Sequence, residues 1–296
     1  MVSDLIFDYL DCESAEEISI LSMGRGIVRD SYEIVTDEES VRYGKPKGRY
    51  ELLGIPEVVS LNSDDICSCT EYLSEILKSI FGNIDSNAKI LVVGLGNRHI
   101  SSDSLGAKVA GKINITIDTK FLPQVMAIAP SVMGLTGIET VDIVEGVIAK
   151  TRPTHVIIID SLCASSEERL VRSIQVTNTG ICPGGGIGNK RKCIDDSIAE
   201  NVFSIGVPLL IFASTFVEGA LTKQSITFDR VSGIMHSLKK SQQNKDFVDL
   251  CKSLERVMKD SMDNVIVSIK DIEESVEVLS TIIANAINIA LGVDEY

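Results

Sequence analysis

The stretch at residues 90–107, ILVVGLGNRHISSDSLGA, carries the strongest indication of the fold. Its first part, 90–93, is an apolar run typical of a buried strand in a parallel sheet. The turn GLGN then interrupts the run, and its glycines let the backbone pass close to a neighbour or a ligand. Asp103 follows, just before a segment that can continue as a helix. In α/β folds, sites lie at this carboxyl edge of the sheet.

Other apolar runs extend the pattern along the chain. Runs at 125–129, 156–159 and 202–205 predict buried strands, and 173–177 predicts a more polar one. A helix should end at Gly82, and Thr136 with Glu139 has the spacing of a capping box for a helix over 138–150. Strands that alternate with helices over short connections predict an α/β fold. Its sheet should be mostly parallel or mixed, twisted, and flanked by helices.

The two ends of the chain differ from this centre. Residues 1–60 carry short alternating pieces that predict hairpins or edge strands attached to the main sheet. Residues 246–292 carry apolar positions at helical spacing and predict C-terminal helices packed on the sheet. Because no repeat and no strong boundary divides the sequence, we expect residues 1–296 to form a single α/β domain.

Composition limits the classes of function. The 296 residues carry a formal net charge of −14, which argues against broad binding to nucleic acid or anionic membranes. No secretory signal pattern opens the sequence, and the late apolar segment 276–291 is interrupted by polar residues. The seven cysteines include no CxxC pair, which favours free thiols in a reducing cytoplasm over a disulfide framework or a zinc site. We expect a cytoplasmic protein without membrane or nucleic-acid partners.

Asp103 and Asp160 are the first candidates for chemistry. Each follows an apolar run, so in a parallel sheet both should emerge at the same edge. Two carboxyl groups within hydrogen-bonding reach do not ionise together, and they can act as base and acid on an attacking water. The pattern alone favours a plainer alternative, in which Asp103 caps a helix and Asp160 satisfies a loop.

Two glycine-rich turns, GLGN and PGGGIGNKRK, are the second candidate. Neither matches a dinucleotide fingerprint or the Walker A spacing, so no cofactor is expected. Close backbone approach to a peptide substrate is the better use, although a solvated basic loop is the usual explanation of the second turn's charges. The candidate substrate contacts are Gly94, Gly96, Asn97, Gly184, Gly185, Gly186, Lys190 and Arg191.

A thiol or a metal site is the third candidate. Cys163 lies shortly after Asp160, and His99 lies shortly before Asp103. A thiolate nucleophile needs a neighbouring imidazole, and His99 with the two aspartates has the donor types of a divalent-metal site. A buried structural cysteine and a surface histidine are more usual, so no metal is expected.

Five motifs follow one another through the centre of the chain: VVGLGN…SDSLG, AIAPSVMGLTGIETVDIVEGV, HVIIIDSLCASS, IQVTNTGICPGGGIGNKRK and IGVP. Together they resemble the spore germination protease family. Near the start, SDLIFD resembles the family's TDLAxE element, and GKPKGRY resembles its counterpart before the sheet. The final helix, ending at Leu291, resembles the family's C-terminal helix, so the resemblance spans nearly the whole chain.

The resemblance implies an endopeptidase that degrades small acid-soluble spore proteins in the spore core during germination. It implies a fold related to hydrogenase-maturation endopeptidases, a homotetramer, and synthesis as a zymogen that loses a short propeptide. It also implies an aspartic-type mechanism in which Asp103 and Asp160 activate a water, without a metal or a covalent acyl-enzyme. This reverses the preference for a helix cap at Asp103.

Some positions depart from the family pattern. Ser165 stands where an arginine is expected, Cys182 where a histidine is expected, and Phe212 where an aspartate is expected. Almost nothing precedes SDLIFD, so either the propeptide is absent or the chain starts at the mature end. These departures bear on substrate preference, zymogen control and activity. Two alternatives stay open: a metal-dependent maturation-type peptidase that uses His99, and a non-catalytic relative that binds peptide.

Overall fold

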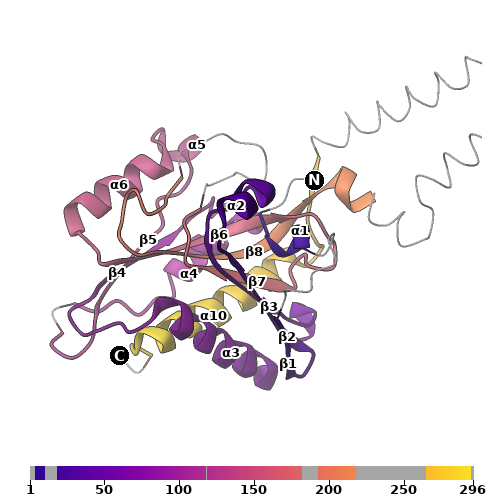
Figure 1. The fold of residues 1–296 in the computed structure, drawn as a ribbon, viewed down its shortest axis with the longest axis horizontal. Coiled ribbons are helices and arrows are strands. Elements are labelled where there is room, and N and C mark those ends of the chain that lie inside the picture. The colour runs from indigo at the N-terminus through magenta and orange to yellow at the C-terminus, as the bar shows by residue number, and fades with distance from the viewer. Residues whose placement is uncertain (1–3, 11–18, 118, 182–192, 218–264, 295–296) are drawn as a thin grey trace, which may run out of the picture.

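In the computed structural model, the described residues are 4–10, 19–117, 119–181, 193–217 and 265–294. Figure 1 shows a central twisted sheet with helices on both faces. In chain order the elements are α1 (Phe7–Leu10), β1 (Ser19–Gly24), β2 (Ile27–Ile34), α2 (Asp37–Tyr43), β3 (Gly48–Gly54), η1 (Val58–Ser60), α3 (Ser63–Phe81), β4 (Lys89–Gly94), η2 (Ser101–Asp103), α4 (Leu105–Ala110), β5 (Gln124–Ile128), α5 (Met133–Thr136), α6 (Thr140–Thr151), β6 (His155–Ala164), β7 (Ser173–Thr177), β8 (Val202–Phe212), β9 (Ile266–Val267) and α10 (Ile272–Leu291).

The sheet combines a parallel centre with an antiparallel extension. Within the described ranges its order is β1-β2-β3-β7-β8-β6-β4-β5, and β9 pairs with β8. Strands β5, β4, β6 and β8 run parallel to one another. Strand β7 is antiparallel to β8, and β3, β2 and β1 continue antiparallel to the edge. The expected α/β class with a mixed sheet, and with N-terminal hairpin strands at its edge, is confirmed.

Two layers of helices cover the sheet. Helices α3, α4 and α10 lie against one face, and α6 lies on the other face, where α2 also sits (Figure 1). Helix α10 is long and apolar enough to cross a membrane by length and composition alone. Its apolar residues, however, pack in the main core cluster with α3 and the central strands, so it is a core helix of this fold. Residues 246–264 of the predicted C-terminal helices lie outside the described part.

The start of α6 and the end of β6 differ from what the sequence predicts. Helix α6 begins at Thr140 without a side-chain cap, and Thr136 instead ends α5 and donates to the backbone oxygen of Ile138 (3.0 Å), so no capping box forms. The predicted strand at 202–205 is the start of a longer strand, β8, which continues through Pro208 to Phe212. Pro208 is tolerated because it lies beyond the last residue that β7 pairs with. Strand β6 does not end at Asp160 but continues to Ala164.

Helix α4 packs against the ends of β4 and β6 with almost no space between the backbones. A Cβ at Gly106 would lie 2.4 Å from the oxygen of Leu95 and 2.6 Å from the oxygen of Ile159. A Cβ at Gly94 would lie 1.9 Å from the oxygen of Gly106. Only glycine fits at these two positions, and their close approach fixes η2, with Asp103, over the end of β4.

We therefore predict that Gly106→Ala destabilises the fold by about 3 kcal/mol or more, because the obstructing atoms are backbone rather than flexible side chain. Gly146→Ala is the matched control, since a Cβ there meets nothing within 4 Å and Gly146 lies inside α6. That control should stabilise the protein by up to about 1 kcal/mol. Chemical denaturation of both variants measures the difference. Equal stability of the two would contradict the close packing of α4.

Candidate active site

The site lies at the point where β4 ends while its neighbour β6 continues. Strand β4 pairs with β6 as far as Gly94, which is opposite Ile159, and the amide of Leu95 donates to the oxygen of Ile159 (2.8 Å). Beyond this point β6 continues to Ala164 with β8 as its neighbour on the other side. The edge of β6 that faced β4 is therefore open, and its backbone N–H groups require other acceptors.

Three aspartates provide those acceptors. The carboxylate of Asp160 accepts from the amide of Ser161 (2.9 Å), the next residue along β6. From the N-terminal segment, Asp4 accepts from the amide of Cys163 (2.9 Å), and Asp8 accepts from the amide of Ser165 (2.7 Å). The open edge of β6 is thus lined by carboxylates at every second residue, and Asp160 is the one nearest to the end of β4.

Asp103 reaches the same place from η2. Its Oδ2 accepts from the amide of Asn97 (2.8 Å) in the turn that follows β4. Gly96 in that turn has φ +98°, and a Cβ there would lie 2.1 Å from the oxygen of Asp103, so glycine is required. The N-cap of α4 is Ser104, without a side-chain cap hydrogen bond. Asp103 is therefore not a helix cap, and its carboxylate lies against Gly96 and Asn97 of the GLGN turn.

The two carboxyl groups differ in their affinity for a proton. Burial raises the pKa of Asp103, and the amide of Asn97 opposes that rise by stabilising the carboxylate. Asp160 is only 8% exposed. Burial raises its pKa well above the ordinary range, and the charges of Asp103 and then Asp4 raise it further, opposed by the amide of Ser161. Asp103 therefore ionises while Asp160 still holds its proton.

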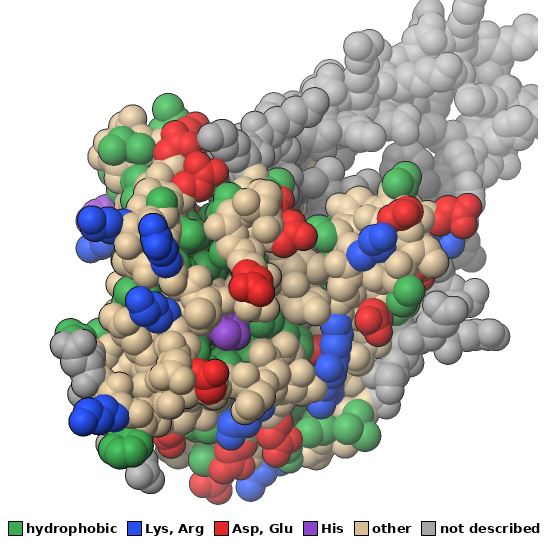
Figure 2. Space-filling view, turned by 60° about the vertical axis from the view of Figure 1, so that its left-hand side comes forward, with side chains coloured by type: hydrophobic (Ala, Val, Ile, Leu, Met, Phe, Trp, Pro, Cys, Tyr) green, Lys and Arg blue, Asp and Glu red, His purple; other side chains and the backbone are tan. Residues whose placement is uncertain are grey.

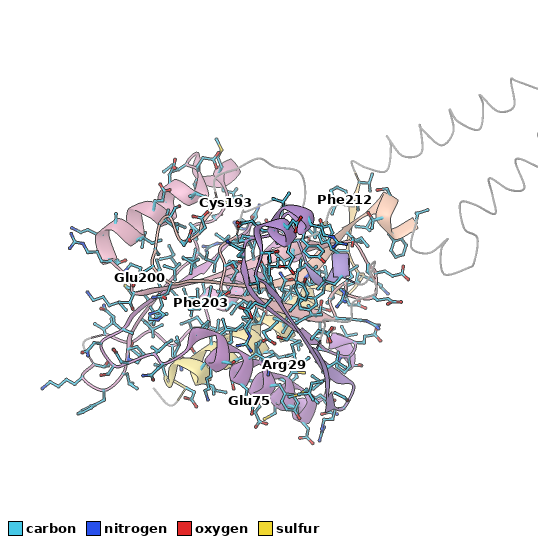
Figure 3. All side chains as sticks on the ribbon, viewed as in Figure 1. Arg29, Glu75, Cys193, Glu200, Phe203 and Phe212 are labelled. Atoms are coloured by element: carbon cyan, nitrogen blue, oxygen red, sulfur yellow. The ribbon has the colours of Figure 1, made fainter. Side chains whose placement is uncertain are left out.

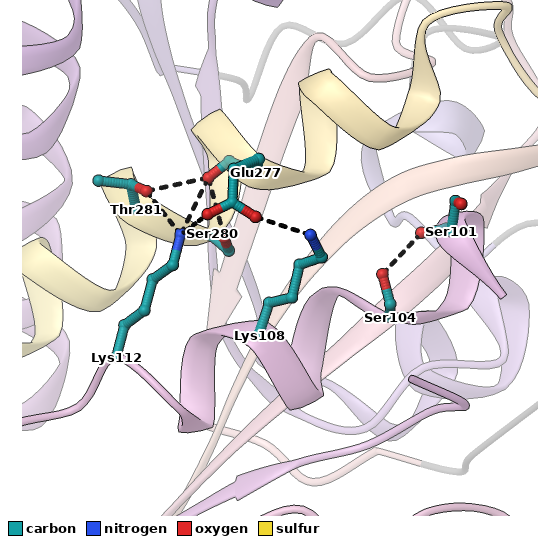
Figure 4. Close-up of polar contacts among 7 residues, drawn as sticks. All are labelled: Ser101, Ser104, Lys108, Lys112, Glu277, Ser280 and Thr281. Carbon is teal, nitrogen blue, oxygen red and sulfur yellow. Dashed lines mark hydrogen bonds and ion pairs between the residues drawn. The ribbon is translucent and has the colours of Figure 1, made fainter. Parts of the chain in front are cut away.

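The network in Figure 4 fixes the helix that follows Asp103. Lys108 and Lys112, on and just after α4, both donate to Glu277 on α10 (2.6 Å each). Lys112 also donates to Ser280 (2.8 Å) and Thr281 (2.7 Å). These contacts lower the pKa of Glu277 to about 2. They connect α4, and through it η2, to the core helix α10.

The thiol and metal candidates do not form. Cys163 is buried with a free thiol whose pKa is raised to about 12 by burial and by the charge of Asp4, so it is not a thiolate nucleophile. His99 is exposed, and its amide donates to the side chain of Asn97 (3.0 Å). Across the described ranges no group of three or more His, Cys, Asp or Glu side chains is placed to hold a metal.

The cysteines agree only in part with the expected free thiols. Cys67, Cys69 and Cys163 carry free thiols. Cys193, in contrast, is disulfide-bonded, so the expectation that disulfides are absent is wrong at that residue.

Several expected site residues cannot be placed. Gly184, Gly185, Gly186, Lys190 and Arg191, together with the departure at Cys182, lie outside the described residues. Substrate contact by Gly94, Gly96 and Asn97 stays a prediction: Gly94 packs against Gly106 of α4, and Gly96 and Asn97 pack against Asp103.

The other two departures lie in different surroundings. Phe212 ends β8 at the far end of that strand from Phe203 and pairs with Ile266 of β9 (Figure 3). Ser165 contributes its backbone amide to Asp8, a contact that any residue except proline could make. The substitution at Ser165 therefore leaves the edge of β6 as it is.

A cavity of about 530 Å³ lies on the face of the sheet beyond Asp160. Gly206, which is opposite Asp160 in the register of β6 and β8, lines it together with Leu162, Lys45, Thr177 and Ser204. Figure 2 shows acidic and basic side chains interspersed on one face of the molecule.

The sequence pattern did not single out Asp4, Asp8 or Ser161, although the Asp-x-x-x-Asp spacing of SDLIFD is visible in it.

Comparison with known proteins adds an identity to this geometry. A family model described as germination protease matches residues 13–249. The chain belongs to the germination protease family. It is 33% identical over 279 residues to a germination protease of Clostridium perfringens, covering 88% of this chain and 82% of that one. For the germination protease of Bacillus subtilis the identity is 31% over 301 residues, covering 87% and 81%. This membership makes the chain a peptidase of spore germination.

Two further similarities cover less of the chain. The germination protease of Priestia megaterium is 40% identical over 194 residues, which are 60% of this chain and 52% of that one. A solved NiFe hydrogenase maturation protease from Thermococcus kodakarensis KOD1 matches 45% of this chain and 80% of its own with a TM-score of 0.32 and 15% identity.

Asp160 should reduce the stability of the germination protease fold at neutral pH. Its carboxyl ordinarily has a pKa of 3.8, and the folded value is raised. As the pH rises above 3.8, the unfolded chain releases this proton while the folded protein keeps it, so stability falls until the folded pKa is passed. Asp160→Asn removes the titration and keeps an oxygen for the amide of Ser161.

We predict that the melting temperature of Asp160→Asn exceeds that of the unmodified protein at pH 7, and that the difference shrinks in acid below the ordinary pKa. Asp64→Asn is the control, because the Asp64 side chain is 81% exposed, and its melting temperature should change little. Thermal unfolding across this pH range measures both. A lower melting temperature for Asp160→Asn at neutral pH would contradict the raised pKa.

Proposed function

We propose that this chain is an aspartic-type endopeptidase that degrades small acid-soluble spore proteins, with Asp103 and Asp160 as its catalytic pair. One observation carries the proposal: η2 places Asp103 against β6, the strand that carries the buried Asp160. Burial raises the pKa of both carboxyl groups, and the charge of Asp103 raises that of Asp160 further. Such a pair provides a base and an acid at the same pH. Membership of the germination protease family supports peptide-bond hydrolysis as the reaction.

The roles follow from the protonation order. Asp103, ionised and held by the amide of Asn97, takes a proton from the attacking water. Asp160, still protonated, gives its proton to the carbonyl oxygen as the new C–O bond forms. The tetrahedral intermediate then collapses, and the proton on Asp103 passes to the leaving amine. As the C–N bond breaks, a hydroxyl of the intermediate returns a proton to Asp160 and the product carboxyl group forms, so both aspartates end in the protonation state in which they began.

The finer features of the protease are part of the same proposal. We place it in the spore core as a homotetramer whose zymogen form loses a short N-terminal segment. Its substrates are proteins rather than nucleic acids or lipids. The alternative, a metal-dependent maturation-type peptidase that uses His99, lacks a supporting cluster of donor side chains in the described ranges.

The test is cleavage of a purified small acid-soluble spore protein by the full chain, followed by mass spectrometry. Asp103→Asn and Asp160→Asn should each lower the rate by about 10²–10⁴-fold, because each removes one partner in proton transfer. Asp64→Asn should cleave at the unmodified rate. Circular dichroism of all variants checks that they are folded.

Two results decide against parts of the proposal. Full cleavage by the Asp103→Asn, Asp160→Asn double variant would contradict the catalytic pair. Loss of activity on chelation, with recovery on adding a divalent metal, would favour the maturation-type alternative. If the unmodified chain binds the substrate without cleaving it, the protein is the non-catalytic relative.

A further inference from the structure

One polar atom beside Asp160 has no function in the scheme above. The Oγ of Ser161 is buried and has no hydrogen-bond partner among the described residues. The other two buried atoms of this kind belong to Asp8 and Arg169, and they form an ion pair 3.2 Å apart. Burying a hydroxyl without a partner destabilises a fold, so a native one requires an explanation.

The position of Ser161 relates this hydroxyl to the catalytic pair. Side chains alternate along β6, so Ser161 lies on the same face as Ile157 and Ile159, which pack in the core with α4 and α10. Its register partner on β8, Val207, belongs to that same core. The short helix η2, which carries Asp103, contacts β6 and also contacts α10, the helix that packs on this face. The amide of Ser161, meanwhile, is held by Asp160.

We propose that the hydroxyl of Ser161 binds the attacking water and orients it against Asp103. This inference rests on the proposed function and assigns it a third catalytic residue. The Oγ is too enclosed to meet a substrate side chain, and buried polar atoms without a protein partner are the atoms that ordered water binds in proteins. The water donates one proton to Asp103 and the other to Ser161 Oγ, which leaves a lone pair for the carbonyl carbon.

The proton balance of the reaction does not change. Asp103 takes the proton of the water as the C–O bond forms, and Asp160 protonates the carbonyl oxygen. Ser161 accepts a hydrogen bond throughout and neither gains nor loses a proton. Its contribution is orientation, and misplacing a reacting group by about 1 Å can lower a rate by about 100-fold.

The test compares Ser161 and Ser275 in the cleavage assay. Ser161→Ala should lower kcat by about 10–100-fold with KM unchanged, because the water, not the substrate, loses a partner. Its melting temperature should stay equal or rise, since no hydrogen bond between protein groups is lost with this hydroxyl. Ser161→Thr keeps the hydroxyl and should recover most of kcat, and a β-branched residue suits a strand.

Ser275→Ala is the matched control. Ser275 is fully buried on α10, and its hydroxyl donates to the oxygen of Asp271 (3.0 Å). Removing a satisfied hydroxyl should lower the melting temperature and leave kcat unchanged. A purely structural Ser161 would give this same result, and that outcome would overturn the inference.

The two proposals fail in different ways. If Asp103→Asn and Asp160→Asn are inactive while Ser161→Ala keeps the unmodified kcat, only the role of Ser161 is overturned. If the aspartate variants remain fully active, the catalytic pair itself fails. In the Asp103→Asn background, Ser161→Ala should cause no further loss, because both residues act on one water. An additional 10-fold loss there would also contradict the shared water.

Discussion

The site depends on the difference in length between two neighbouring parallel strands. Strand β4 stops at Gly94, opposite Ile159, whereas β6 continues to Ala164. In the interior of a protein, an open strand edge must find hydrogen-bond acceptors. Carboxylates meet that need on β6, and one of them belongs to the strand itself, Asp160. The carboxylate that accepts a hydrogen bond from the backbone of β6 is thus also a buried group at the edge where β4 has ended.

Backbone contacts then bring the second carboxyl group to the first. Gly94 and Gly106 let α4 approach the ends of β4 and β6, and Gly96 leaves room for Asp103 in the turn. On its outer side α4 is fixed to α10 by the lysines that share Glu277. Because the supports of Asp103 are backbone and core contacts, its carboxylate is held by the whole fold. The same packing keeps Asp160 buried and so keeps its pKa raised.

The sequence was sufficient for the elements with one clear periodicity. The buried strands, the stop at Gly82 and the mixed α/β class could be predicted, because apolar runs and glycines act locally. The end of β6 could not, because it depends on where a different strand, β4, stops. The Thr136–Glu139 spacing was misleading, because Thr136 is the last residue of α5 and does not lie at the start of α6. Local spacing identifies a possible cap, and tertiary packing decides whether it forms.

The two aspartates proposed for catalysis could be named from the sequence, but their surroundings could not. Asp103 and Asp160 were found by their places after apolar runs and by resemblance to a family. Asp4 and Asp8 contact residues that lie 159 and 157 positions later in the sequence, so no local pattern signals these contacts. The lone hydroxyl of Ser161 is visible only once its neighbours are known. Burial and long-range partners are properties of the fold rather than of a motif.

The charge of Asp103 raises the pKa of Asp160, and titration of the side-chain carboxyl carbons of both residues measures this coupling directly. NMR of protein labelled with carbon-13 at aspartate, recorded against pH, should show Asp160 releasing its proton after Asp103. In Asp103→Asn the midpoint for Asp160 should move to lower pH, because a neighbouring negative charge has been removed. An Asp160 midpoint that is the same in both proteins, or that lies in the ordinary range of an aspartate, would contradict the account.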